Sequence, residues 1–136
     1  MSQTLAKETP RSKKIIKTPN ASLPVGPYNQ AVATGSLIYT AGQIPLDKSG
    51  NMVAGTIKEQ TTQVLENVKA VIEAGGSSLE KVIKATVFLK DLNDFAGMNE
   101  VYAQYFKAET APARTTIQVA RIPKDSLVEI EVVAVI

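Results

Sequence analysis

The sequence contains neither cysteine nor histidine, and these two absences exclude a large share of enzyme chemistry. Without cysteine the chain has no disulfide and no thiol nucleophile, and without either residue the common zinc sites and the Ser-His and Cys-His dyads are excluded. Histidine is also the commonest general base at neutral pH. Any proton transfer must therefore use Asp, Glu, Lys, Tyr or water.

Long hydrophobic runs are missing too, so we expect neither a membrane span nor a secretory signal. The net charge of +2 is too small to argue for nucleic-acid binding. We predict a flexible tail over residues 1–13 and one globular domain over residues 14–136. Because the tail has a single arginine and also Glu8, it fits a transit peptide poorly. The expected location is the cytoplasm, with an organellar address as the alternative.

Hydrophobic periodicity and turn residues predict an α+β fold in which two helices cover one face of a single sheet. The clearest helix carries a capping box, with Thr56 at the N-cap and Glu59 three residues later, and it ends at Gly75. The expected elements are a short edge strand at 14–17, a hairpin over Ala31–Ala41, helices over Thr56–Ala74 and Phe95–Phe106, and strands over Val82–Lys90, Thr115–Arg121 and Leu127–Ile136.

The last strand has an unusual second face. Side chains alternate along a strand, so Val128, Ile130 and the next alternate residues form one apolar face. The opposite face is apolar at both ends and carries Glu129 and Glu131 in the middle. This pattern predicts a sheet covered on both sides, by helices on one and by another subunit on the other. A carboxylate at such an interface needs a cation, hydrogen-bond donors or a raised pKa.

Arg114 is the cation that such a carboxylate could meet. It follows the stiff segment Ala111–Ala113 and precedes a strand, and a guanidinium held in this way can bind a carboxylate through two parallel hydrogen bonds. Composition does not decide whether the bound carboxylate belongs to a ligand or to Glu129. A structural ion pair and a ligand site both stay open at this point. The aromatic residues of the second helix, Phe95, Tyr102, Tyr105 and Phe106, have helical spacing and are predicted to pack in the core.

Several segments together resemble the Rid family of reactive intermediate deaminases, formerly called YjgF-like proteins. The resemblance runs from about Lys14 to the end of the chain and keeps both order and spacing. Its segments are Gly26–Ala31, Gly42–Pro45, Glu66–Ala70, Lys84–Leu92, Pro112–Thr116, Val119–Asp125 and Val128–Glu131.

The resemblance implies a chorismate-mutase-like fold that assembles as a homotrimer, with active sites in clefts between subunits. The implied reaction is the hydrolysis of reactive 2-imino acids, such as 2-iminopropanoate and 2-iminobutanoate, to 2-oxo acids and ammonia. This activity would protect pyridoxal-phosphate enzymes. It needs no cofactor and no metal, and it involves neither a membrane nor nucleic acid.

The resemblance also assigns roles to individual residues. Arg114 matches the arginine that holds the substrate carboxylate, and Glu129 matches the acidic residue beside the attacking water. Gly42 matches the glycine whose N–H helps to hold the carboxylate, and Tyr28 matches the aromatic residue that lines the pocket. Weaker matches to pocket-lining positions are Phe88, Asn99 and Thr116.

Two positions depart from the pattern of many relatives, which have Ser where this chain has Ala41 and Cys where it has Thr116. A mechanism that needs that hydroxyl or that thiol is excluded here. Two other functions stay open on sequence grounds. One is an RNA-directed translation inhibitor or endoribonuclease, and the other is a non-catalytic trimer that binds small carboxylates or client proteins.

Overall fold

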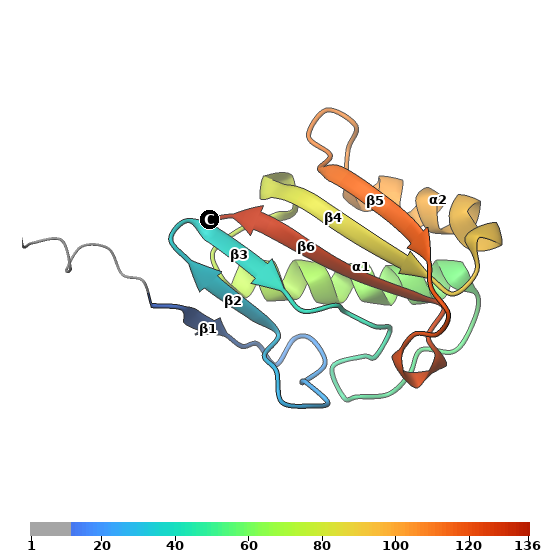
Figure 1. Cartoon of the computed structure of the whole chain (residues 1–136), viewed down its shortest axis with the longest axis horizontal. Coiled ribbons are helices and arrows are strands. Elements are labelled where there is room, and N and C mark those ends of the chain that lie inside the picture. Colours follow the sequence, from blue (N-terminus) through green and yellow to red (C-terminus); the bar gives the residue numbers. More distant parts are fainter. Residues whose placement is uncertain (1–11) are drawn as a thin grey trace, which may run out of the picture.

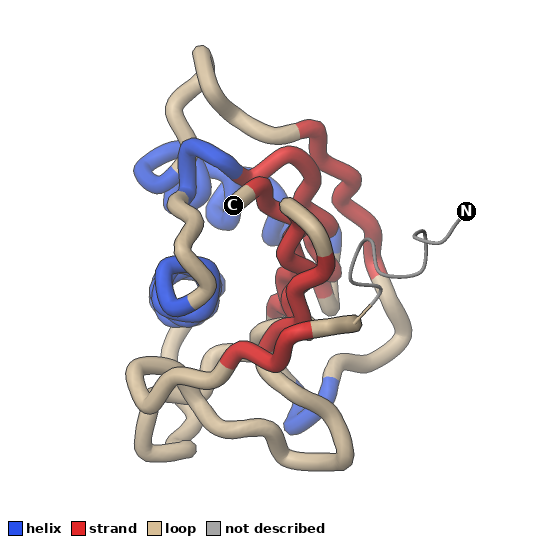
Figure 2. Tube along the Cα trace, turned by 90° about the vertical axis from the view of Figure 1, so that its left-hand side faces the viewer, coloured by secondary structure: helices blue, strands red, loops and turns tan. Residues whose placement is uncertain are grey.

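The computed structural model describes residues 12–136, and residues 1–11 of the predicted tail lie outside the described residues. A single six-stranded sheet has the order β1-β2-β3-β6-β4-β5, in which only β4 and β5 run parallel. Both helices lie on one side of this sheet, and its other face is open (Figures 1 and 2). The elements are β1 (Lys14–Ile16), β2 (Ala31–Thr34), β3 (Leu37–Thr40), α1 (Ile57–Ala74), β4 (Val82–Leu89), α2 (Phe95–Tyr105), β5 (Ala113–Gln118) and β6 (Val128–Val135). The predicted α+β class is confirmed.

Helix α1 begins and ends where the capping residues predict. The backbone N–H of Thr56 donates to the Glu59 carboxylate over 2.7 Å, which satisfies a donor that would otherwise be unpaired at the N-terminus. Gly75 forms the C-cap, and its N–H donates to the Ile72 carbonyl oxygen at 3.1 Å. A Cβ on Gly75 would lie 2.7 Å from the side chains of Ile16 and Ile38. Glycine at this position therefore lets the helix end approach the sheet closely.

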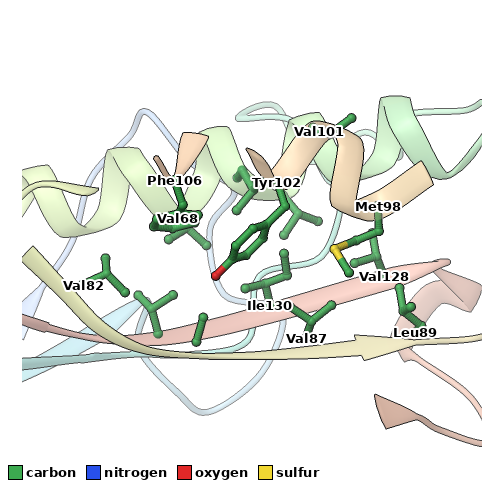
Figure 3. Packing of buried hydrophobic residues seen from close by; sticks show 14 of the residues in the cluster. Val68, Val82, Val87, Leu89, Met98, Val101, Tyr102, Phe106, Val128 and Ile130 are labelled. Carbon is green, nitrogen blue, oxygen red and sulfur yellow. The ribbon is translucent and has the colours of Figure 1, made fainter. Parts of the chain in front are cut away.

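The main core fills the space between the helices and the sheet (Figure 3). Alternate residues of β4 and β6 point towards the helices, and α1 and α2 contribute the opposing side chains. Full burial of one such aliphatic or aromatic side chain contributes about 1.5–3 kcal/mol. The labelled members of this cluster in Figure 3 are Val68, Val82, Val87, Leu89, Met98, Val101, Tyr102, Phe106, Val128 and Ile130.

Two predictions about the second half of the chain need correction. Strand β5 covers Ala113–Gln118 instead of Thr115–Arg121, because its parallel pairing with β4 begins directly after Pro112. The aromatic residues of α2 do not all pack in the core. Tyr102 and Phe106 are buried, whereas Phe95 is 39% exposed and Tyr105 directs its hydroxyl to Glu66 over 2.6 Å.

The alternation predicted for β6 is confirmed. Val128, Ile130, Val132 and Ala134 are buried under the helices, while Glu129, Glu131, Val133 and Val135 are on the open face. The neighbouring strands extend this open face with apolar side chains that are 41–48% exposed, namely Ile15, Tyr39 and Ile117.

Candidate functional site

A proline-stiffened loop carries Tyr28, and Gln30 at its end fixes the shape of the loop. The Gln30 side chain is buried; its amide oxygen accepts from the Thr18 N–H at 2.8 Å, and its amide nitrogen donates to the carbonyl oxygens of Thr18 and Ser22 at 3.1 and 2.9 Å. The Tyr28 hydroxyl accepts from the Val25 N–H at 3.2 Å. These bonds order the loop from within and leave the Tyr28 ring about half exposed at the molecular surface.

Gly42 lies beside Glu129 because the segment after β3 continues alongside β6. Gln43 and Ile130 exchange two backbone hydrogen bonds of 2.8 and 3.2 Å. A Cβ on Gly42 would collide with the Glu129 carboxylate, since it would lie 2.8 Å from the carboxyl carbon. Glycine at position 42 therefore leaves the space that the Glu129 carboxylate occupies. Gly42 also lines the same hollow as Tyr28.

Glu129 is a partly buried carboxylate without an ionic partner among the described residues. Burial raises its pKa above the ordinary value, and the neighbouring charge of Glu131 adds to the effect. Phe88 is its register partner on β4, so the aromatic ring and the carboxylate share the open face of the sheet. Phe88 also packs against the small apolar cluster of Ile44, Leu46 and Ile122.

Arg114 points to the other side of the sheet. Its register partner on β4 is Ala85, which is fully buried on the helix side. The guanidinium carbon lies over the ring of Tyr102, 4.6 Å from the ring centroid, and 5.5 Å from that of Phe95. Within residues 12–136 the guanidinium forms no ion pair. No carboxylate of the described residues therefore neutralises its charge.

Asn99 and Thr116 are on the same side as Arg114. Asn99 and Arg114 line an open cleft of about 900 Å³, together with Tyr102 and the chain between α2 and β5. Thr116 pairs with the buried Val87, which turns its hydroxyl towards the helices. The hydroxyls of Thr116 and Tyr102 are buried and have no hydrogen-bond partner among the described residues.

The seven candidate residues thus form two groups on opposite faces of one sheet. Arg114, Asn99 and Thr116 belong to the helix side, and Glu129, Phe88, Gly42 and Tyr28 belong to the open side or its rim. The alternative of a structural ion pair between Arg114 and Glu129 in one chain is wrong, because the sheet separates the two side chains.

Sequence reasoning missed the contact of Arg114 with Phe95 and Tyr102, which were expected only to pack in the core. Their spacing of seven residues does indicate one face of a helix. However, the edge strand opposite that face depends on the parallel pairing of β4 and β5, for which the sequence contains no local signal.

Two features are absent from the described part of the chain, a membrane-spanning helix and an acidic metal-binding cluster. Neither helix there is long and apolar enough to cross a membrane. No three acidic side chains gather in residues 12–136 in a way that could hold a metal ion.

The fold and the two residue groups define a small single-sheet α+β protein with candidate site residues on both faces of the sheet. Comparisons with known proteins give the family. The model of the family described as endoribonuclease L-PSP matches residues 18–136. A RutC family protein of Pyrococcus horikoshii is 58% identical over 123 residues, with 90% of this chain and 97% of the relative covered.

Two other similar proteins have names that mention a reaction or a bound molecule. A 2-iminobutanoate/2-iminopropanoate deaminase of Salmonella typhimurium is 48% identical over 124 residues, which cover 90% of this chain and 97% of the relative. The crystal structure of Escherichia coli TdcF with bound serine has a TM-score of 0.85 and 47% identity over 90% of this chain and 98% of that one. The chain belongs to the Rid (YjgF/RidA) family, as its motifs predicted.

Proposed function

We propose that this protein hydrolyses reactive 2-imino acids, such as 2-iminobutanoate and 2-iminopropanoate, to 2-oxo acids and ammonia. Two observations support the proposal. A relative at 48% identity over 90% of this chain is named for this activity. In addition, the chain carries an arginine without an ionic partner among the described residues and a carboxylate of raised pKa, which are the two groups that the proposed reaction needs.

The observation that carries the proposal is the separation of Arg114 from Glu129. Both groups are without an ionic partner in residues 12–136, and the sheet lies between them. A 2-imino acid is too small to bridge the two groups, because β4 lies between β5 and β6, neighbouring strands are about 4.8 Å apart, and the two side chains point to opposite faces. We therefore propose that the complete site forms between two copies of the chain, with Arg114 from one copy and Glu129 from the next.

The apolar side chains on the open face favour such an assembly. Tyr39, Ile117 and Ile15 are each more than 40% exposed there, and exposed apolar clusters mark interaction surfaces. If the open faces of three copies meet, this surface is buried and each Glu129 is carried to the rim of a neighbouring copy. The proposed assembly is the homotrimer that the family resemblance implies.

The proposed chemistry uses few groups. Arg114 binds the substrate carboxylate through two N–H donors, with the backbone N–H of Gly42 as a further donor. Glu129 accepts a proton from water as the water oxygen bonds to C2 and the C=N π bond breaks. The protonated carboxyl group then donates to the nitrogen, which gives a carbinolamine. The Glu129 carboxylate next takes the proton of the C2 hydroxyl and passes it to the nitrogen, and the C–N bond breaks as the C=O bond of the 2-oxo acid forms and ammonia leaves. A raised pKa suits a group that must hold the proton between these steps.

A coupled assay tests this activity directly. A serine/threonine dehydratase generates the imine, semicarbazide traps it, and the protein competes with the trap by converting imine to 2-oxo acid. The expected result is less semicarbazone with the wild type and no such decrease with Arg114→Ala or Glu129→Ala, both of which stay trimeric. A wild type that diverts none of several 2-imino acids would contradict the catalytic proposal.

The same variants separate the two alternative functions. Binding of a small carboxylate that depends on Arg114, without turnover, would favour a non-catalytic trimer. RNA cleavage that survives further purification and disappears in Arg114→Ala or Glu129→Ala would favour an endoribonuclease. The absence of histidine and a net charge of only +2 argue against the endoribonuclease.

A further inference from the structure

The guanidinium of Arg114 lies over the face of an aromatic ring. Its central carbon lies 4.6 Å from the centroid of the Tyr102 ring, and Phe95 contributes a second, more distant ring at 5.5 Å. A cation over an aromatic face is attracted by the ring electrons, and contacts of this kind are strongest within about 6 Å. A guanidinium has five N–H donors in a planar fork, so a ring beside it leaves donors for a carboxylate.

The side chain of Tyr102 is itself held in place by its packing in the core. Its ring is 7% exposed and packs against Phe106 with the ring centroids 4.6 Å apart. Figure 3 shows the side chain between α2 and the sheet, with its hydroxyl directed towards the strands. Arg114 stands on the edge strand β5, which has a neighbour on one side only. A long side chain at such an edge has many rotamers, and a rigid ring beside it reduces their number.

We propose that Tyr102 is a positioning residue for Arg114, and that its ring fixes the guanidinium plane so that two N–H groups face the substrate carboxylate. The proposal rests on the proposed function for the identity of that carboxylate. The contact of the ring with the guanidinium does not depend on it.

The hydroxyl of Tyr102 has a smaller role. It is buried without a hydrogen-bond partner among the described residues. Burial raises its pKa, and the nearby guanidinium opposes this effect only in part, so the hydroxyl stays protonated and neutral at physiological pH. A neutral hydroxyl carries no charge with which to compete with the substrate carboxylate for the guanidinium, even where the two groups touch. We assign the positioning effect to the ring for this reason.

The test compares substitutions that keep or remove the ring. Tyr102→Leu removes it, Tyr102→Phe keeps it without the hydroxyl, and Tyr105→Leu is the matched control on the same helix, because Tyr105 contacts Glu66 instead. Calorimetry measures the binding of 2-oxobutanoate to each trimer. We expect Tyr102→Leu to weaken binding about tenfold and Tyr102→Phe to recover most of that loss, since a buried cation–ring contact has about this strength.

Activity gives an independent reading. Loss of positioning should raise KM for 2-iminobutanoate with little change in kcat, because Arg114 binds the carboxylate in the ground state and in the transition state alike. General damage to the core would instead lower the fraction of active protein and therefore kcat. If Tyr102→Leu does not fold, Phe95→Leu removes the outer ring from a more exposed position, and we expect it to weaken binding by about two- to threefold.

An NMR signal keeps this inference separate from the proposed function. The Nε–H resonance of Arg114, identified by its loss in Arg114→Lys, should carry a ring-current shift that disappears in Tyr102→Leu and persists in Tyr102→Phe. If wild type binds no 2-oxobutanoate, the proposed function fails, and this resonance alone decides the contact. The inference is overturned if the resonance is the same in all variants, or if Tyr102→Leu binds 2-oxobutanoate as tightly as wild type.

Discussion

The two faces of the sheet differ in what covers them, and the candidate site is divided between them. The helix side is covered by α1 and α2. On this side Arg114 extends from the edge strand β5 and contacts the aromatic ring of Tyr102 on α2. The open side has no cover within the chain and presents Glu129 among apolar side chains. One face is thus covered by a packed core, while the other has no cover within the described chain. A single chain carries both groups of candidate residues, on opposite faces of its sheet.

Removal of the Arg114 guanidinium on the helix side should have the largest effect on activity. Arg114→Ala deletes two charge-assisted hydrogen bonds to the substrate carboxylate, each with about 1.5–3 kcal/mol, so we expect kcat/KM to fall about 10³-fold. The coupled dehydratase assay measures the change. Arg121→Ala is the control, since Arg121 is an exposed arginine that pairs only with Asp125 at 2.7 Å. An equal loss in both variants would contradict a specific role for Arg114.

Removal of the Glu129 charge on the open side should have the second largest effect on activity. Glu129→Gln keeps the shape of the side chain but cannot accept a proton, and we expect kcat to fall about 10²-fold with 2-oxobutanoate binding unchanged. Glu131→Gln changes the neighbouring carboxylate on the same face of the same strand and should retain nearly full activity. If Glu131→Gln is the more damaging variant, the assignment of the proton-transfer group is wrong.

A smaller effect is expected from a change that moves Glu129 without altering it. Gly42→Ala places a methyl group against the carboxylate, which must shift. We expect kcat to fall about tenfold, because a displacement of about 1 Å in a reacting group is costly. Steady-state kinetics measure the effect, and a crystal structure of the variant should show the displaced carboxylate. Wild-type kcat with the carboxylate in place would contradict the packing described here.

The smallest predicted effect concerns stability and pH. The pKa of Glu129 is raised in the folded chain, so the folded state binds its proton more tightly than the unfolded state does. Ionisation of Glu129 therefore lowers the free energy of unfolding as pH rises from its ordinary pKa of about 4.5 through the raised pKa. Glu129→Gln should raise Tm at pH 7 and change it little at pH 4. Thermal unfolding at the two pH values checks this, and the opposite order would show that the carboxylate is stabilised by a partner.

Much of the fold was predictable because its signals are local. The capping residues Thr56 and Glu59 fixed the start of α1, and Gly35, with φ +58°, marked the turn of the hairpin. The alternation in β6 predicted an apolar second face. The start of β5 was less predictable. The sequence predicts a stiff segment over Ala111–Ala113 before the strand, whereas the pairing with β4 already begins at Ala113.

The site was predictable only as a set of residues. The motifs of the family select Arg114 and Glu129, and alternation along each strand says that neighbouring residues face opposite ways. Neither indicates which face of β5 corresponds to which face of β6. That relation is set by the pairing of β4 with both strands, which involves residues 29 to 52 positions apart. The separation of the two groups therefore appears only in the structure.

Mixing two inactive variants tests most directly whether the site needs two copies of the chain. Arg114→Ala and Glu129→Gln trimers are unfolded together, refolded at equal amounts, and assayed, with mass spectrometry confirming mixed trimers. Over all randomly assembled trimers, each site has about a one-in-four chance of receiving an intact Arg114 from one copy and an intact Glu129 from the next. We predict that about a quarter of wild-type activity returns. Mixed trimers no more active than their parents would show that both groups act from the same chain.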